Sequence, residues 1–173
     1  MDEAERIERC ARLSERIEAH FRRVHKDSMH DVPICNAQLS VASVGFRPCG
    51  DWAVGIIVTP WFMNVFAAPF ATPVAAGPGE TQRLALPNGE VDFLGAEIEG
   101  LGRLLSCSLF SPMDEFIDQP AALVTATAAL DALLTPPAAK RETPKAHLDR
   151  RAFFRGAFSG RRGGADVLDE TDA

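Results

Sequence analysis

The spacing of apolar residues changes along this chain, and the change limits the folds that the chain can adopt. Between residues 3 and 26 the apolar side chains recur at steps of three and four, which is typical of an amphipathic helix. These positions are Ile7, Cys10, Leu13, Ile17, Phe21 and Val24. Between residues 38 and 47 apolar side chains alternate with their neighbours, as they do in β-strands, and further strand-like segments follow. A helix followed by alternating segments predicts an α+β fold.

Turn residues divide the rest of the chain into short segments. Pro87-Asn88-Gly89 separates two of them and is typical of a β-hairpin. The run PAALVTATAALDALL begins with Pro120 and ends before Pro136, which indicates a second helix. The predicted strands are 38–47, 52–59, 61–68, 81–86, 91–95 and 104–110, and the predicted helix is 120–134. We therefore expect one domain over residues 1–137, with an N-terminal helix, an antiparallel sheet of about five to six strands and a C-terminal helix.

Charge is unevenly distributed along the chain. Residues 1–137 carry 10 Lys and Arg against 18 Asp and Glu, a net charge of −8. Residues 138–162 carry 8 against 2, or +6, and the last eleven carry 0 against 4, or −4. An acidic body argues against nucleic acid as the main partner and favours a basic protein partner. Residues 138–173 hold few core-forming side chains, so we expect a mobile tail.

The patterns that usually mark an enzyme are missing. The sequence contains no G-x-S-x-G, P-loop, G-x-G-x-x-G or H-E-x-x-H pattern, and its four cysteines form no C-x-x-C pair. We therefore expect a protein without catalytic activity, cofactor or resident metal, and with free thiols. Two alternatives stay open, a serine hydrolase and a metal- or redox-handling factor. The second would use Cys35 and Cys49 together with His25 or His30.

The sequence also predicts a cytoplasmic protein. No stretch approaches the roughly 20 apolar residues that a membrane span requires. The N-terminal run MDEAERIERCARLSERIEAHF carries charges throughout, unlike a secretory signal or a transit peptide.

Two segments look suited to binding another protein. Thr59-Pro60-Trp61-Phe62-Met63-Asn64 places large apolar groups on both faces of a predicted strand. Residues 106–118 place carboxylates beside apolar side chains, an arrangement that suits a peptide with paired arginines next to an apolar stretch. The alternatives are a strand buried on both faces and an ordinary acidic helix start. The candidate client-binding residues are Trp61, Phe62, Met63, Asn64, Phe110, Met113, Asp114, Glu115, Phe116 and Asp118.

The predicted tail carries a twin-arginine-like segment at residues 149–156. It resembles the export consensus Ser/Thr-Arg-Arg-x-Phe-Leu-Lys, with Asp149 in place of the hydroxyl residue. Arg150, Arg151 and Phe153 match the consensus, while Phe154 replaces its leucine and Arg155 its lysine. Its C-terminal position and the polar run that follows exclude an export signal. The segment occupies the client site of its own chain, recruits another factor, or is a basic run that arose by chance. Equal peptide affinity with and without residues 138–173 would exclude the first role.

Three runs together resemble a known family. VGFRPCGDWAVGIIVTPWFMN, RLALPNGEVDFLGAE and GLGRLLSCSLFSPMDEFIDQPAA are similar to the HybE family of nickel–iron hydrogenase assembly chaperones, which includes the HupJ proteins. The resemblance covers roughly residues 15–135, and TPWFMN and SCSLFSPM are its most specific parts. It implies a cytoplasmic, non-catalytic protein that binds the twin-arginine signal of a hydrogenase small-subunit precursor until its metal centres are installed. The large subunit and other maturation factors are further partners that the resemblance implies.

Overall fold

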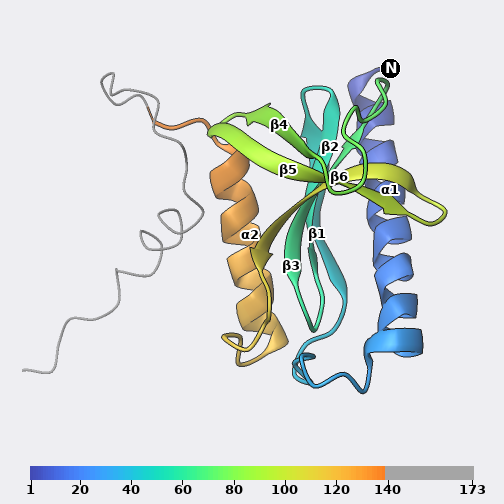
Figure 1. Cartoon of the computed structure of the whole chain (residues 1–173). Coiled ribbons are helices and arrows are strands. Elements are labelled where there is room, and N and C mark those ends of the chain that lie inside the picture. Colours follow the sequence, from blue (N-terminus) through green and yellow to red (C-terminus); the bar gives the residue numbers. More distant parts are fainter. Residues whose placement is uncertain (139–173) are drawn as a thin grey trace, which may run out of the picture. The chain divides into compact units, whose positions relative to one another are not determined.

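The computed structural model describes residues 1–138, and it confirms the predicted α+β fold (Figure 1). The helices are α1 (Glu3–Val24), a short π-helix η1 (His25–Met29) and α2 (Gln119–Leu134). The strands are β1 (Ala42–Cys49), β2 (Trp52–Val58), β3 (Met63–Pro69), β4 (Thr81–Leu86), β5 (Gly89–Ile98) and β6 (Gly102–Phe110). The predicted tail and its twin-arginine-like segment lie outside the described residues, apart from Ala138.

The six strands form one antiparallel sheet in the order β1-β2-β3-β6-β5-β4. Two hairpin meanders, β1-β2-β3 and β4-β5-β6, therefore meet where β3 pairs with β6. The turn between β4 and β5 is shorter than the sequence suggested, because Gly89 already pairs with Leu86 and only Pro87 and Asn88 stay outside the ladder.

Charged residues stabilise both ends of helix α1. The Asp2 side chain accepts a hydrogen bond from the Glu5 amide at 2.8 Å and caps the first turn. Acidic residues stand in the first turn and Arg22 and Arg23 in the last, as the helix dipole favours. Cys10 and Ile17 are buried from this helix, and burial, followed by the Glu3 charge, raises the pKa of the Cys10 thiol to about 11.

The first strand starts four residues later than the sequence predicts, at Ala42 rather than at residue 38. The Gln119 side chain accounts for the difference. Its Oε1 accepts a hydrogen bond from the Ser40 amide at 2.9 Å, and its Nε2 donates to the Ser40 carbonyl at 3.2 Å. Because a side chain satisfies both backbone groups of Ser40, this segment joins α2 instead of extending the sheet.

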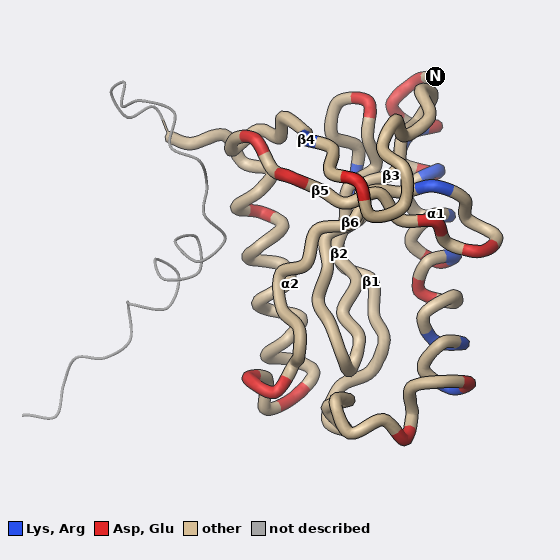
Figure 2. Tube along the Cα trace, in the orientation of Figure 1, with Lys and Arg blue, Asp and Glu red and all other residues tan. Residues whose placement is uncertain are grey.

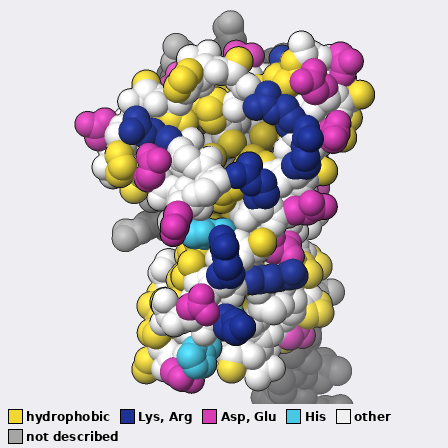
Figure 3. Space-filling view, turned by 90° about the vertical axis from the view of Figure 1, so that its right-hand side faces the viewer, with side chains coloured by type: hydrophobic (Ala, Val, Ile, Leu, Met, Phe, Trp, Pro, Cys, Tyr) yellow, Lys and Arg dark blue, Asp and Glu magenta, His cyan; other side chains and the backbone are white. Residues whose placement is uncertain are grey.

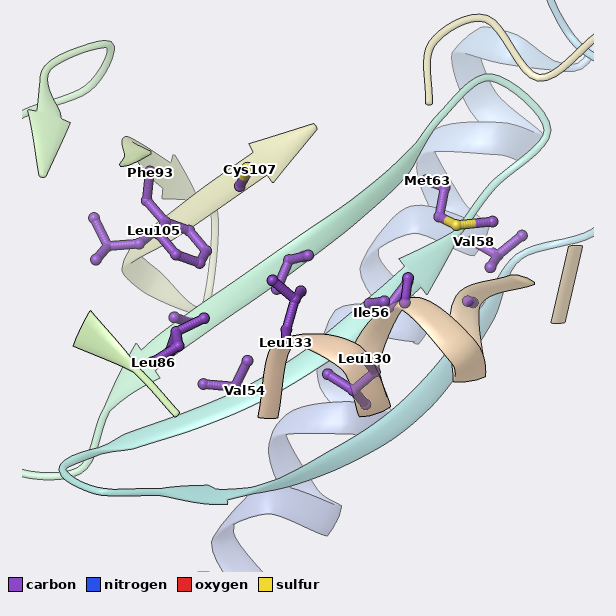
Figure 4. Close-up of a cluster of buried hydrophobic side chains, with 14 of the residues drawn as sticks. Val54, Ile56, Val58, Met63, Leu86, Phe93, Leu105, Cys107, Leu130 and Leu133 are labelled. Carbon is purple, nitrogen blue, oxygen red and sulfur yellow. The ribbon is translucent and has the colours of Figure 1, made fainter. Parts of the chain in front are cut away.

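Each face of the sheet has its own core. Along β3, Met63, Val65 and Ala67 belong to the cluster that α2 covers, whereas Phe66 and Ala68 belong to the cluster that includes Ile17 of α1. Figure 4 shows the first cluster, in which Leu130 and Leu133 of α2 lie against the sheet. Alternate side chains of β3 thus pack on the α2 side and on the α1 side of the sheet. In the described part of the chain, no helix has the length and apolar character needed to cross a membrane.

A pair of substitutions in α2 tests this packing. Leu130 is 2% exposed and Val124 on the same helix is 69% exposed. We expect Leu130→Ala to lower the free energy of unfolding by about 2 to 5 kcal/mol, because truncation leaves a cavity. Val124→Ala should change it by less than about 0.5 kcal/mol. Urea unfolding monitored by circular dichroism measures both, and similar losses would contradict the placement of α2.

Candidate functional site

The two segments singled out as binding segments lie next to each other in the structure. At the ends of β3 and β6, Met63 is paired with Phe110, and the Ser111 hydroxyl lies 3.4 Å from the Trp61 carbonyl oxygen, to which it donates. Residues 30–41 join them there, since the Asn36 amide donates to the Pro60 carbonyl at 2.8 Å. We call this end of the fold, formed by residues 30–41, 59–62 and 111–118, the loop end; it lies at the bottom of Figure 1.

A buried threonine shapes the turn between β2 and β3. The Thr59 hydroxyl accepts hydrogen bonds from the amides of Trp61 and Phe62, at 3.2 and 2.9 Å, and donates to the Phe62 carbonyl at 3.0 Å. This turn fixes the direction of both aromatic rings. Trp61 packs near His25 with 5.7 Å between ring centroids, and Phe62 packs edge-on against Phe21 at 5.2 Å. Both rings are half-buried, so part of each faces solvent.

The next two residues of this segment point in opposite directions. Met63 is fully buried in the cluster under α2, which places it in the core and not on the binding surface that the sequence suggested. The reason is that both faces of β3 are covered, so an apolar residue need not be exposed on either. Asn64 is half-buried; its Nδ2 donates to Ser106 Oγ at 3.2 Å, and its buried Oδ1 has no hydrogen-bond partner among residues 1–138.

The segment before α2 divides in the same way. Met113 and Phe116 are buried, and Phe116 packs edge-on against the half-buried Phe110 with 5.0 Å between centroids. These two residues therefore close the core at the loop end and are not available to a client at the surface. Asp114 and Glu115 are exposed between them. In Figure 2 the acidic positions of this segment are drawn in red at the lower end of α2.

Asp118 serves as the N-cap of α2. Its carboxylate accepts a hydrogen bond from the Ala121 amide at 2.8 Å. The helix-start alternative thus applies to Asp118. Asp114 and Glu115 form no ion pair or hydrogen bond with any residue of the described chain, and they stay open to a partner.

The loop end also carries exposed apolar residues that the sequence analysis missed. Ile117 is 80% exposed, Ile34 43% and Val32 36%. Asn36 holds their two segments together, because its Nδ2 donates to the carbonyl oxygens of Met113 and Phe116 at 3.1 and 2.7 Å. No periodic pattern marks the three residues, because they lie in irregular segments between regular elements.

The structure does not bring together the two cysteines of the alternative metal site. Cys35 lies at the loop end, where its thiol is 3.1 Å from the Met29 carbonyl, whereas Cys49 lies at the far end of β1 beside Trp52. The two thiols therefore cannot share one ion. Burial raises the pKa of both, so each holds its proton more firmly than an ordinary cysteine. Among residues 1–138 no three His, Cys, Asp or Glu side chains are grouped to hold a metal.

Comparison with known proteins identifies relatives over most of the chain. The family model of the nickel–iron (NiFe) hydrogenase assembly chaperone HybE matches residues 12–156, which extends beyond the resemblance at 15–135 and includes the twin-arginine-like segment. The hydrogenase expression/formation protein HupJ of Bradyrhizobium diazoefficiens is 43% identical over 83% of this chain and 87% of its own. The hydrogenase-2 operon protein HybE of Escherichia coli K12 is 30% identical over 83% of this chain and 89% of its own.

A solved structure supports the fold independently. The solution structure of HybE from Escherichia coli superposes with a TM-score of 0.58 at 24% identity, over 87% of this chain and 91% of that one. At this level of identity the solved structure shows that the two proteins share a fold. Membership of the family is shown by the family model and by the identity with HupJ. The chain therefore belongs to the HybE family of nickel–iron hydrogenase assembly chaperones.

Proposed function

We propose that this protein binds the twin-arginine signal peptide of a hydrogenase small-subunit precursor at the loop end and retains the precursor in the cytoplasm until assembly is complete. One observation carries the proposal: the exposed carboxylates of Asp114 and Glu115 and the exposed side chain of Ile117 stand in one short segment. The hydrogen bond from Ser111 to the Trp61 carbonyl joins this segment to the turn that carries the half-buried rings of Trp61 and Phe62. A twin-arginine signal presents the complementary chemistry, since two guanidinium groups precede apolar side chains. The protein acts by binding alone in this proposal, and the large subunit is a second candidate client.

The charges of the loop end favour a basic peptide. Asp31 is exposed in the same part of the fold and adds a third carboxylate. A guanidinium group binds a carboxylate through two parallel hydrogen bonds, which fixes its orientation. Because Asp114 and Glu115 have no partner within residues 1–138, no ion pair inside that part of the chain has to break before a client binds. The proposal therefore assigns orientation to the carboxylates and most of the affinity to the apolar contacts.

The first prediction concerns the client. A synthetic twin-arginine signal peptide should bind the full-length protein, and its dissociation constant should rise with salt because exposed charges are screened. Replacing both peptide arginines by lysine should weaken binding, since lysine lacks the bidentate fork. Isothermal titration calorimetry at two ionic strengths measures both effects. Affinity that ignores salt and the lysine change would contradict a role for the carboxylates.

A second prediction concerns the acidic side chains of the protein. Asp114→Asn with Glu115→Gln should weaken peptide binding by about tenfold, because two exposed ion pairs of up to about 1 kcal/mol each together approach the roughly 1.4 kcal/mol of a tenfold change. The matched control, Glu5→Gln with Glu15→Gln, removes the same charge from exposed positions on α1. Equal weakening in both variants would reduce the effect to net charge and would contradict a local site.

A third prediction separates binding from folding. Ile117→Ala should weaken peptide binding without lowering the melting temperature, because Ile117 is 80% exposed. The control Ile7→Ala makes the same change in the N-terminal part of α1, at a residue that is 55% exposed and lies outside the loop end. It should leave both the peptide affinity and the melting temperature unchanged. Titrations of the labelled peptide and thermal melts of each variant check this. Unchanged affinity in Ile117→Ala would remove the apolar part of the proposed site.

A further inference from the structure

A cavity of about 500 Å³ lies between α1 and the sheet, and four arginines line it. Arg9, Arg12 and Arg16 lie at steps of three and four along one face of α1. Arg103 enters from the start of β6. Apolar side chains, including Leu13 and Leu104, complete the lining. Figure 3 views the molecule from this side and shows Lys and Arg side chains around hydrophobic surface in the upper half.

The arginine-lined cavity contrasts with the charge of the rest of the body. Residues 1–137 carry 18 Asp and Glu, yet no carboxylate lines this cavity. Arg12 and Arg103 pair with carboxylates outside the lining, and the positive charge of Arg9 and Arg16 is left to attract an anion. Along α1, Arg12 and Arg22 pair with Glu8 and Glu18, whereas Arg9 and Arg16 pair with no carboxylate within residues 1–138.

Two of the arginines are held in place by backbone groups. Arg9 donates to the Phe70 carbonyl at 2.8 Å, and its guanidinium carbon lies 5.6 Å from the centroid of the Phe70 ring. Arg16 donates to the Gly100 carbonyl. Within residues 1–138 neither forms an ion pair, and each keeps further N–H donors for a ligand.

The other two arginines have partners that a ligand can replace. Arg12 lies 3.5 Å from Glu8 and Arg103 lies 3.4 Å from Glu97, and all four side chains are well exposed. Such pairs contribute little stability, so a bound anion can compete for the guanidinium groups. The cavity thus has two fixed and two adjustable cationic groups, contributed by α1 and β6.

We propose that this cavity binds an acidic, partly apolar peptide segment of a partner protein, at a surface distinct from the loop end. The rise along α1 from Arg9 to Arg16 is about 10 Å, longer than one phosphate group. Same-side residues of an extended peptide are about 6 to 7 Å apart, so a row of carboxylates matches a row of guanidinium groups. The apolar lining accommodates the intervening side chains. Phosphate sites usually add the free amides of a helix start, whereas Asp2 already caps α1.

A peptide titration tests the proposal on the full-length protein. The probe is a short fluorescein-labelled peptide of alternating glutamate and leucine, followed by fluorescence anisotropy. We expect Arg12→Gln with Arg103→Gln to weaken its binding by about tenfold, since two charged contacts are lost. Arg12 and Arg103 are chosen because, unlike Arg9 and Arg16, they donate no hydrogen bond to a backbone carbonyl in the described part of the chain. The double variant should therefore keep the melting temperature of the unsubstituted protein.

The matched control is Arg23→Gln with Lys26→Gln, which removes the same charge from exposed positions outside the cavity. It should weaken binding by less than about twofold, as expected of distant surface charges. Equal losses in both double variants would mean attraction to net charge alone and would overturn the proposal. Displacement of the probe by inorganic phosphate, at a concentration where chloride of equal ionic strength has no effect, would assign the cavity to phosphate and would also overturn it.

Discussion

The pairing of β3 with β6 is the contact on which the rest of this structure depends. Each hairpin meander forms from neighbouring segments, but β3 and β6 are separated by the whole of β4 and β5. Closing that loop costs chain entropy, which only the burial of both sheet faces can offset. The same pairing brings Met63 beside Phe110 and so joins the turn at residues 59–62 to the segment before α2. The candidate site exists because the two meanders meet there.

Much of the fold could be predicted from the sequence, because the periods of its elements differ clearly. The alternating strands and the Pro87-Asn88 turn were placed to within a few residues. The start of β1 was not, because the side chain of Gln119, distant in sequence, replaces the expected strand partner of Ser40. Alternation along one strand also does not tell how many faces of a sheet are covered. That is why Met63 was expected at a surface and lies in the core.

The candidate site was predictable only in part, for a related reason. The sequence indicated the acidic positions Asp114 and Glu115, because carboxylates beside apolar residues are visible in a linear pattern. It did not indicate Ile34 or Ile117, whose importance comes from their exposure at the same end of the fold. The arginine-lined cavity was hidden as well, since a net charge of −8 over residues 1–137 averages over a local concentration of positive charge. In the two proposals, the loop end binds a basic segment and the arginine-lined cavity binds an acidic one.

The central claim is that the loop end receives the signal peptide, and chemical-shift mapping tests it most directly. The full-length protein, labelled with nitrogen-15, would be titrated with an unlabelled twin-arginine signal peptide. The account predicts shift changes concentrated at residues 59–62, at 111–117 and around Ile34, with the indole signal of Trp61 among them. Saturable changes confined to the arginine-lined cavity or to the exposed face of α2, with the loop end unaffected, would contradict it.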